Sequence, residues 1–251
     1  MTRSTPEGPD GGPALTGDDG IVEFPERSFL GGLGPDDLDA LLTSGHRVAR
    51  APGQALCREG DPSSAVWFLL GGHVKLSKVA LSGREVLLEL RGPGDVVGEM
   101  GVIDGGARSA SVIALGHAEL LSLAPAAFFE VLDQRAGIAR RLREEQVARL
   151  RQASVRQLEL GTAEVVGRLA QRLVELAGSL GVHQEAGSGA GPGVLIAEGI
   201  SQQDLADWCG TSRDSVVRAL RQLRSAGLVD SGRSRMLIRD LPALRALATS
   251  G

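Results

Sequence analysis

The sequence has few residues that could form disulfides or metal sites. Cys57 and Cys209 are the two cysteines in a chain of 251 residues. They are too few for a disulfide framework, and too few for a four-cysteine cluster or a zinc site within one chain. His46, His117 and His183 show no spacing typical of metal ligands. We therefore expect a protein of a reducing compartment that carries no metal or other cofactor.

Long apolar runs are also missing. The longest, Ala65 to Leu70, is far shorter than the roughly 20 residues that cross a bilayer. The segment from Met1 to Gly20 has no apolar core of a signal peptide. These absences predict a cytoplasmic protein with no membrane partner.

The chain lacks the strong overall positive charge of a protein that coats nucleic acid along its whole surface. Its formal net charge is −4, but the charge is unevenly distributed. From Ser201 to Gly251 there are eight arginines and five aspartates, a local balance of +3, so the remainder carries about −7. An apolar fraction of 42% is enough to build two cores. The sequence therefore indicates two domains with different tasks.

The N-terminal residues 1–27 are predicted to be a disordered tail. Residues 1–20 combine five glycines, three prolines and four acidic residues with almost nothing to bury, so the segment cannot offset its ordering entropy. The stretch that begins at Gly34 has Pro and Asp followed by helical apolar spacing. It predicts a short helix packed on the domain that follows.

Residues 28–136 are predicted to form a β-barrel domain. Between Arg47 and Leu123, short β-branched or apolar runs alternate with turns rich in Gly, Pro and Asp. Strands at this spacing are typical of an all-β sandwich or barrel, and no helix is expected among them. The predicted strands are residues 66–70, 74–79, 85–90, 111–114 and 119–123.

A long helix is predicted from residue 137 to 160. Positions 139, 142, 146, 150, 153, 157 and 160 alternate three and four apart, although Gln146 and Gln157 interrupt the apolar seam. A seam of this kind is typical of a helix that pairs with its twin, which predicts a homodimer. The alternative is a single helix that lies against its own barrel.

The final domain is predicted to span residues 161–251. Gly161 ends the long helix and Thr162 can cap the next one. The Gly-rich loop from Glu185 to Gly193 lacks the Lys-Ser/Thr ending of a phosphate-binding loop, and is expected to be a flexible surface insertion.

Residues 200–223 read as two helices joined by a tight turn. Ser201 can cap the first helix, Gly210 permits a left-handed turn, and Ser212 can cap the second. Residues 228–238 then predict a hairpin with a basic tip that contains Arg233 and Arg235, suited to a phosphate backbone. Together they predict a winged helix-turn-helix, against the alternative of an ordinary surface helical hairpin.

The second helix carries side chains that can read DNA bases. Val216, Leu220 and Leu223 would form its buried stripe. An arginine can donate two hydrogen bonds to guanine and a carboxylate can accept one from cytosine. The exposed residues with this chemistry are Arg213, Asp214, Arg218 and Arg221.

The order of barrel, long helix and winged helix-turn-helix resembles the CRP/FNR family, the cyclic AMP receptor proteins and their relatives, from about residue 28 to 245. The stretch Gly94-Asp-Val-Val-Gly-Glu-Met-Gly-Val-Ile-Asp-Gly-Gly-Ala-Arg-Ser-Ala looks like the family's phosphate-binding cassette. The resemblance implies an α+β chain made of a β-roll or jelly-roll cyclic-nucleotide-binding domain, a dimerisation helix and a winged helix-turn-helix domain.

The cassette predicts how a cyclic phosphate would be held. A rigid cyclic anion needs a buried cation, here Arg108, and several donors, which Ser109 and the backbone near Gly98 can supply. By resemblance, Glu99 would accept from the ribose 2′-hydroxyl, whereas a Glu–Arg pair outside such a cassette is more often a structural salt bridge. The expected ligand-binding residues are Gly98, Glu99, Met100, Arg108, Ser109 and Ser154.

Two departures from the family pattern concern the sensed ligand. Members that sense oxygen through an iron–sulfur cluster carry an N-terminal cysteine group that is missing here, and Cys57 and His73 are expected to be a buried thiol and a strand histidine rather than haem ligands. Cyclic AMP-responsive members usually present adjacent Thr and Ser to the purine, where this chain has Ala153 and Ser154. Losing one hydroxyl removes a hydrogen bond worth about 0.5–1.5 kcal/mol, which leaves base selectivity open.

The helix-turn-helix follows the family more closely. Arg213, Asp214 and Arg218 match the family's base-reading Arg, Glu and Arg, and Ser201 matches a residue that contacts backbone phosphate. Asp214 is one methylene shorter than Glu, which weakens the expected cytosine contact. The expected DNA-binding residues are Ser201, Gln203, Ser212, Arg213, Asp214, Arg218, Arg221 and Arg233.

The sequence thus predicts a homodimeric transcription regulator, controlled by cyclic AMP or a related cyclic nucleotide, that binds a palindromic operator in double-stranded DNA and contacts RNA polymerase. One alternative is a regulator that needs no ligand or responds to another effector, such as a cyclic dinucleotide. A nucleotide-processing enzyme is the alternative outside DNA binding. It is disfavoured, because the sequence has no nucleophile–base pair, metal set or Walker-type loop.

Overall fold

The computed structural model describes residues 23–80, 83, 85–184, 193–196, 200–232 and 235–249. The predictions for the tail before residue 23, the loop at 185–192 and Arg233 lie outside them. The helices are α1 Pro35–Thr43, α2 Glu99–Ile103, α3 Pro125–Gln134, α4 Ala136–Thr162, α5 Val165–Ser179, α6 Gln202–Trp208, α7 Arg213–Ser225 and α8 Leu241–Thr249. The barrel strands are β1 His46–Arg50, β2 Ala55–Cys57, β3 Val66–Gly71, β4 Val74–Val79, β5 Glu85–Arg91, β6 Val96–Val97, β7 Ser111–Ala114 and β8 Ala118–Leu123. The C-terminal strands are β9 Gly181–Gln184, β10 Gly193–Ile196, β11 Val229–Gly232 and β12 Arg235–Ile238.

The N-terminal domain is a β-roll made of two antiparallel sheets. One sheet has the order β1-β8-β3-β6 and the other has the order β2-β7-β4-β5. One apolar cluster, with Trp67, Leu69 and Leu120, lies between the sheets. A second cluster, with Phe68 and Phe128, packs the outer face of the first sheet under α1, α3 and the start of α4. The expected strands are confirmed. They could be predicted because apolar runs bounded by turns are a strong strand signal.

The prediction of no helix among the strands is wrong at one place. The chain forms the five-residue helix α2 within the cassette. One helical turn is too short to show an apolar period, so a sequence pattern cannot reveal it.

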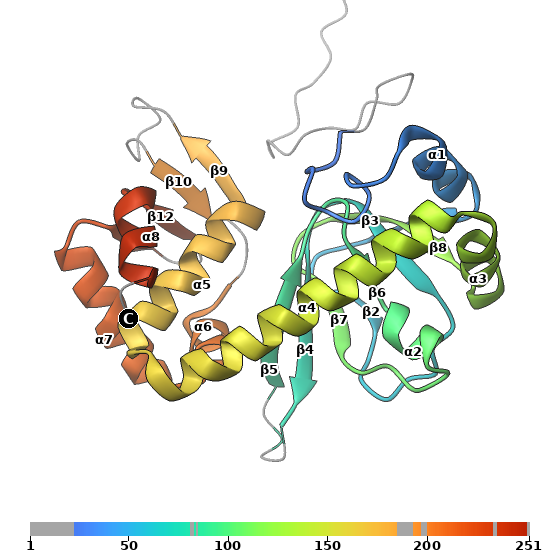
Figure 1. The fold of residues 1–251 in the computed structure, drawn as a ribbon. Helices are drawn as coiled ribbons and strands as arrows, with labels where there is room; N and C mark the ends of the chain where they lie inside the picture. The colour runs from blue at the N-terminus through green and yellow to red at the C-terminus, as the bar shows by residue number, and fades with distance from the viewer. Residues whose placement is uncertain are drawn as a thin grey trace, which may run out of the picture.

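Helix α4 crosses the molecule from the barrel to the C-terminal domain (Figure 1). Its first turns lie against the chain's own barrel, where Ile138 and Leu142 are buried. Farther along, the apolar side chains of Val147, Leu150, Val155 and Leu158 are exposed. The predicted seam is therefore wrong in its first part, because Leu142 belongs to the barrel core, while the later part of the helix has an exposed apolar surface.

The expected break at Gly161 is also wrong. The helix continues through Gly161 to Thr162, and α5 begins at Val165 after Glu164. A single glycine costs a helix about 1 kcal/mol, which the neighbouring turns can offset. Thr162 therefore ends α4 and does not cap α5.

The C-terminal domain packs its helices against a four-stranded sheet of order β11-β12-β10-β9. Its core holds Leu169, Leu173, Val216 and Leu220, and the same cluster contains Leu87 and Leu90 of β5. The hairpin β11–β12 confirms the predicted wing. Within the described ranges, no helix is long and apolar enough to cross a membrane.

Truncating Ile138 tests the packing of α4 on the barrel. The side chain is fully buried, so Ile138→Ala removes apolar contacts and leaves a cavity, at a cost of about 2–5 kcal/mol. Urea denaturation should show a lower midpoint. The control Val79→Ala, at a side chain that is 55% exposed, should change stability by less than about 0.5 kcal/mol. Equal effects of the two substitutions would contradict this packing.

Candidate ligand pocket and DNA-reading surface

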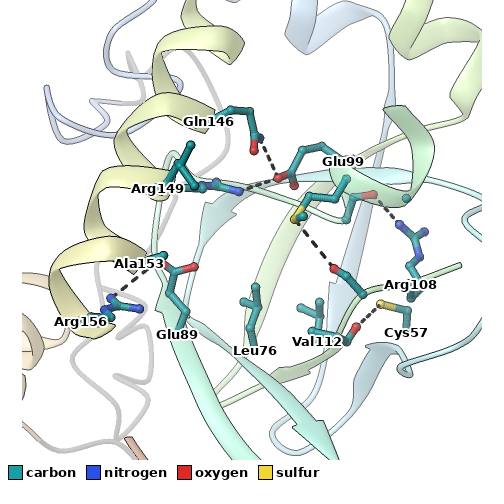
Figure 2. A pocket seen from close by; sticks show the side chains of 16 residues that line it. Cys57, Leu76, Glu89, Glu99, Arg108, Val112, Gln146, Arg149, Ala153 and Arg156 are labelled. Carbon is teal, nitrogen blue, oxygen red and sulfur yellow. Dashed lines mark hydrogen bonds and ion pairs between the residues drawn. The ribbon is translucent and has the colours of Figure 1, made fainter. Parts of the chain in front are cut away.

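A pocket of about 360 Å³ lies between the β-roll and α4 (Figure 2). The cassette forms one wall and the helix forms the other. The β-roll and the cassette contribute Cys57, Leu76, Glu89, Gly98, Glu99, Met100, Gly101, Arg108, Ser109, Ala110 and Val112, and α4 contributes Gln146, Arg149, Leu150, Ala153 and Arg156. The volume lies within the range of small-molecule sites. Five of the six predicted ligand residues line it.

Arg108 is a buried cation in this pocket. It is 4% exposed, its guanidinium lies 4.5 Å from the ring centre of Trp67, and it donates to the carbonyl oxygens of Gly98 and Ala65 at 2.6 and 2.7 Å. Burial lowers the pKa of Arg108. No carboxylate pairs with it in the described part of the chain, and its Nε has no hydrogen-bond partner there. The pocket therefore contains a positive charge that forms no ion pair with a carboxylate among the described residues.

The backbone at Gly98 fixes the position of this arginine. Gly98 has φ 78°, in the left-handed region that favours glycine. A Cβ there would lie 2.7 Å from Nη1 of Arg108 and 2.9 Å from the Trp67 ring. Glycine is thus needed both for the turn and for the close approach of the backbone to the guanidinium.

Glu99 is held by α4 and not by Arg108. Its side chain is 2% exposed, and its Oε1 accepts from Nη1 of Arg149 at 2.6 Å and from Nε2 of Gln146 at 2.9 Å. Burial lowers the pKa of Arg149, but Glu99 and Glu145 outweigh it, and the pKa is raised overall. The carboxylate of the cassette is therefore ionically tied to the long helix.

Sequence reasoning missed the residues that α4 contributes. Gln146, Arg149 and Arg156 line the pocket, and Nη1 of Arg156 donates to the Leu88 carbonyl at 3.1 Å. These positions are three or four apart on one face of the helix together with Ala153. The recurrence of polar side chains at this spacing is the signal that could have indicated them.

The remaining predicted ligand residues, Met100, Ser109 and Ser154, are exposed. Met100 and Ser109 line the pocket but are exposed, with Ser109 Oγ 3.9 Å from Met100 Sδ. Ser154 is exposed and its hydroxyl donates to the Leu150 carbonyl. Ser154 does not line the pocket of its own chain, whereas Ala153 does.

Cys57 is buried, as predicted, whereas His73 lies in the turn between β3 and β4 and not in a strand, so that prediction is wrong. Cys57 is a buried thiol at the pocket wall, 3.8 Å from the Ala110 carbonyl, and burial raises its pKa. Nε2 of His73 lies 2.7 Å from the Ser179 carbonyl. In the ranges that the structure describes, no group of His, Cys, Asp or Glu is arranged to hold a metal ion.

Helices α6 and α7 form the predicted helix-turn-helix. Ser201 caps α6 in a reciprocal capping box with Asp204, Gly210 adopts φ 61° in the turn, and Ser212 caps α7 by accepting from the Ser215 amide. These contacts confirm the local structure that the two serines and the glycine predict.

The outer face of α7 has the predicted base-reading chemistry. Val216, Ala219, Leu220 and Leu223 are buried, whereas Arg213, Asp214, Arg218 and Arg221 are exposed. Gln203 donates to Asp207 at 2.9 Å, within α6. Arg224 donates to Ser231, which ties α7 to the wing. Arg235 at the start of β12 is exposed.

Comparison with known proteins identifies both halves of the chain. Residues 47–135 match the cyclic nucleotide-binding domain, and residues 167–247 match the Crp-like helix-turn-helix domain. The chain is 31% identical over 217 residues to the cyclic AMP receptor protein of Thermus thermophilus, covering 86% of this chain and 94% of that relative. The chain belongs to the CRP/FNR family.

Other members of the CRP/FNR family agree with this assignment. The CRP-like cAMP-activated global transcriptional regulator of Mycobacterium tuberculosis is 28% identical over 83% of this chain and 91% of its own length. A solved CRP-family regulator of Thermus thermophilus is 26% identical, with a TM-score of 0.67, over 81% of this chain and 97% of that one. The FixK2 structure from Bradyrhizobium japonicum, 23% identical with a TM-score of 0.67 over 81% and 96% of the two chains, shows the same fold. The protein is thus a CRP/FNR transcription regulator with a cyclic-nucleotide-binding domain and a DNA-binding helix-turn-helix.

Removing Arg149 tests the tie between the cassette and α4. In Arg149→Met the buried Glu99 loses its cation and keeps only Gln146. Breaking a buried ion pair by removing one partner costs about 3–5 kcal/mol, so the urea midpoint should fall. The control Arg140→Met, on the same helix with a side chain that is 75% exposed, should have little effect. A stable Arg149→Met protein would show that the pair contributes little to folding.

Proposed function

We propose that this regulator binds cyclic AMP, or a related cyclic nucleotide, and then acts in the cytoplasm as a homodimer on a palindromic DNA operator. The observation that carries the proposal is the buried guanidinium of Arg108, which has no carboxylate partner among the described residues. A buried charge without a partner is costly, and a phosphate anion in the pocket removes that cost with a charge-assisted hydrogen bond.

The neighbouring groups fit the rest of a cyclic nucleotide. Gln146 and Arg149 both donate to Oε1 of Glu99, so Oε2 can accept from the ribose 2′-hydroxyl. Ser109 and the backbone near Gly98 face the phosphate. The base then lies against α4 near Ala153 and Arg156, which line the same pocket.

The position of Ser154 requires a second subunit for its proposed role. Its side chain is exposed and does not line its own pocket. In a dimer formed through α4, the hydroxyl can reach the base in the partner's pocket. The exposed Val147, Leu150, Val155 and Leu158 supply the apolar surface of such a helix pair.

The proposed dimer also sets the spacing of the two DNA-binding domains. A two-fold axis along paired α4 helices presents two copies of α7 to successive major grooves, ~34 Å apart. In this proposal Arg213, Asp214, Arg218 and Arg221 read base edges, and Ser201, Gln203, Ser212 and Arg233 are the further DNA-binding residues. RNA polymerase is the further partner of the bound regulator.

A second candidate effector is a cyclic dinucleotide. Ala153 lacks the hydroxyl expected for purine selection, and a Xanthomonas campestris regulator described as c-di-GMP responsive shares the fold, at 22% identity. The second candidate replaces the ligand and keeps the same DNA-binding function. A version without any ligand leaves the charge of Arg108 unexplained.

Titration calorimetry tests the proposed pocket. Arg108→Ala should weaken cyclic AMP binding at least about 30-fold, because truncating one partner of a buried charge pair costs about 2 kcal/mol or more. The matched control Arg58→Ala, an exposed arginine of the same domain, should bind as the unaltered protein does. Unchanged affinity in Arg108→Ala would contradict the proposal, and binding of cyclic di-GMP alone would favour the second candidate.

Competition on DNA tests the reading helix. On an operator selected from random duplexes, Arg218→Ala should cost about 1–3 kcal/mol and relax the preference for one base pair. Its control, Arg140→Ala on α4, should leave both affinity and preference unchanged. An equal loss on every duplex would show that Arg218 contacts only the phosphate backbone.

A further inference from the structure

A second cavity, of about 600 Å³, lies between the β-roll, α4 and the DNA-binding domain. We call it the interdomain cleft. Its basic and aromatic lining residues are Arg27, Arg91, Arg151, Arg156, Arg172 and Trp208. They come from the segment before α1, from β5, α4, α5 and α6, so the cleft exists only while the two domains are in contact.

The cleft is positively charged. Five arginines line it, against the three acids Glu89, Asp95 and Glu175. The two glutamates are already engaged: Glu89 lies 2.8 Å from Arg91, and Glu175 lies 3.5 Å from Arg156 and pairs with Arg172. Asp95 accepts from the Gly92 amide at 2.9 Å. In the part of the chain that the structure describes, neither Arg27 nor Arg151 forms an ion pair with a carboxylate. The positive charge of the cleft therefore exceeds its negative charge.

Two buried donors in the wall lack acceptors. Arg91 is 8% exposed and its Nε has no hydrogen-bond partner among the described residues. Trp208 is also 8% exposed, and its indole Nε1 likewise has no hydrogen-bond partner among the described residues. A buried donor without an acceptor costs about 1–3 kcal/mol, and native structures contain few such groups. Both donors belong to residues that line the cleft, so a ligand bound there is placed to supply an acceptor.

We propose that the interdomain cleft binds a phosphate-bearing small molecule, in contact with Arg91 and Trp208. A phosphate group supplies the negative charge that offsets the excess arginines and the oxygens that accept from the two buried donors. The cavity is large enough for a phosphorylated molecule of nucleotide size. This site is separate from the cyclic-nucleotide pocket and does not depend on Arg108.

The site also adjoins the first pocket. Glu89 and Arg156 line both cavities, and Arg156 lies 3.9 Å from Glu89 and 3.5 Å from Glu175. An anion that draws Arg156 toward the cleft changes the wall of the cyclic-nucleotide pocket. Occupancy of the cleft is thus coupled to occupancy of that pocket.

The test uses inorganic pyrophosphate, which has phosphate oxygens but neither sugar nor base. The full-length chain carries Trp67→Phe, so that Trp208 is its single tryptophan. Pyrophosphate should change the fluorescence of Trp208 saturably, at an ionic strength held constant with potassium chloride. Arg91→Gln and Arg27→Gln should each weaken this binding at least about tenfold. Arg108→Gln, in the other pocket, and Arg140→Gln, on the exposed face of α4, should leave it unchanged.

Three results would overturn the proposal. The first is a fluorescence change that does not saturate or that potassium chloride reproduces. The second is unchanged binding of pyrophosphate in Arg27→Gln. If Arg91→Gln fails to fold because Arg91 is buried, the result for Arg27→Gln alone decides whether the proposal stands. The third is loss of binding in Arg108→Gln, which would place pyrophosphate in the cyclic-nucleotide pocket. Because Arg108→Gln separates the two sites, failure here would leave the proposed function intact.

Discussion

The structure of the ligand pocket depends on one buried positive charge, the guanidinium of Arg108. Two carbonyl oxygens and the face of Trp67 hold it, and no carboxylate neutralises it within the described residues. Carbonyl dipoles and an aromatic face stabilise a cation less than an anion does. The arginine is therefore fixed in position and still able to gain from a negative ligand. The left-handed Gly98 makes this arrangement possible, because a Cβ there would collide with both the guanidinium and Trp67.

Helix α4 connects this pocket to the rest of the molecule. Its first turns complete the barrel core through Ile138 and Leu142, its middle holds the cassette through Arg149 and Glu99, and its last part contacts both domains through Arg156. A change in the pocket therefore acts on a helix that also positions the DNA-binding domain. In the proposed function, this continuous helix is the physical route by which a ligand in the pocket acts on the DNA-binding domain.

Much of the fold could be predicted from the sequence, because its signals are local. Apolar runs bounded by turns identified β3, β4 and β5, and the capping residues Ser201 and Ser212 marked the starts of α6 and α7. The cassette motif likewise identified Arg108. The rest depends on tertiary contacts. Helix α2 is a single turn, too short to show an apolar period. The continuation of α4 through Gly161 overrides the local preference of glycine for ending a helix. The pairing of Arg149 with Glu99 joins residues 50 positions apart, and no local pattern specifies such a pair.

The most direct test of the central claim is a nitrogen-15 NMR titration of the Arg108 Nε–H group with cyclic AMP. This group has no acceptor among the described residues, and burial makes its exchange with water slow enough to observe. We predict that saturating cyclic AMP moves the Nε–H signal to the downfield shift of a hydrogen-bonded, ion-paired guanidinium and protects it further from exchange. A signal that stays unchanged while cyclic AMP is bound would contradict the claim that this buried cation is the anchor of the ligand.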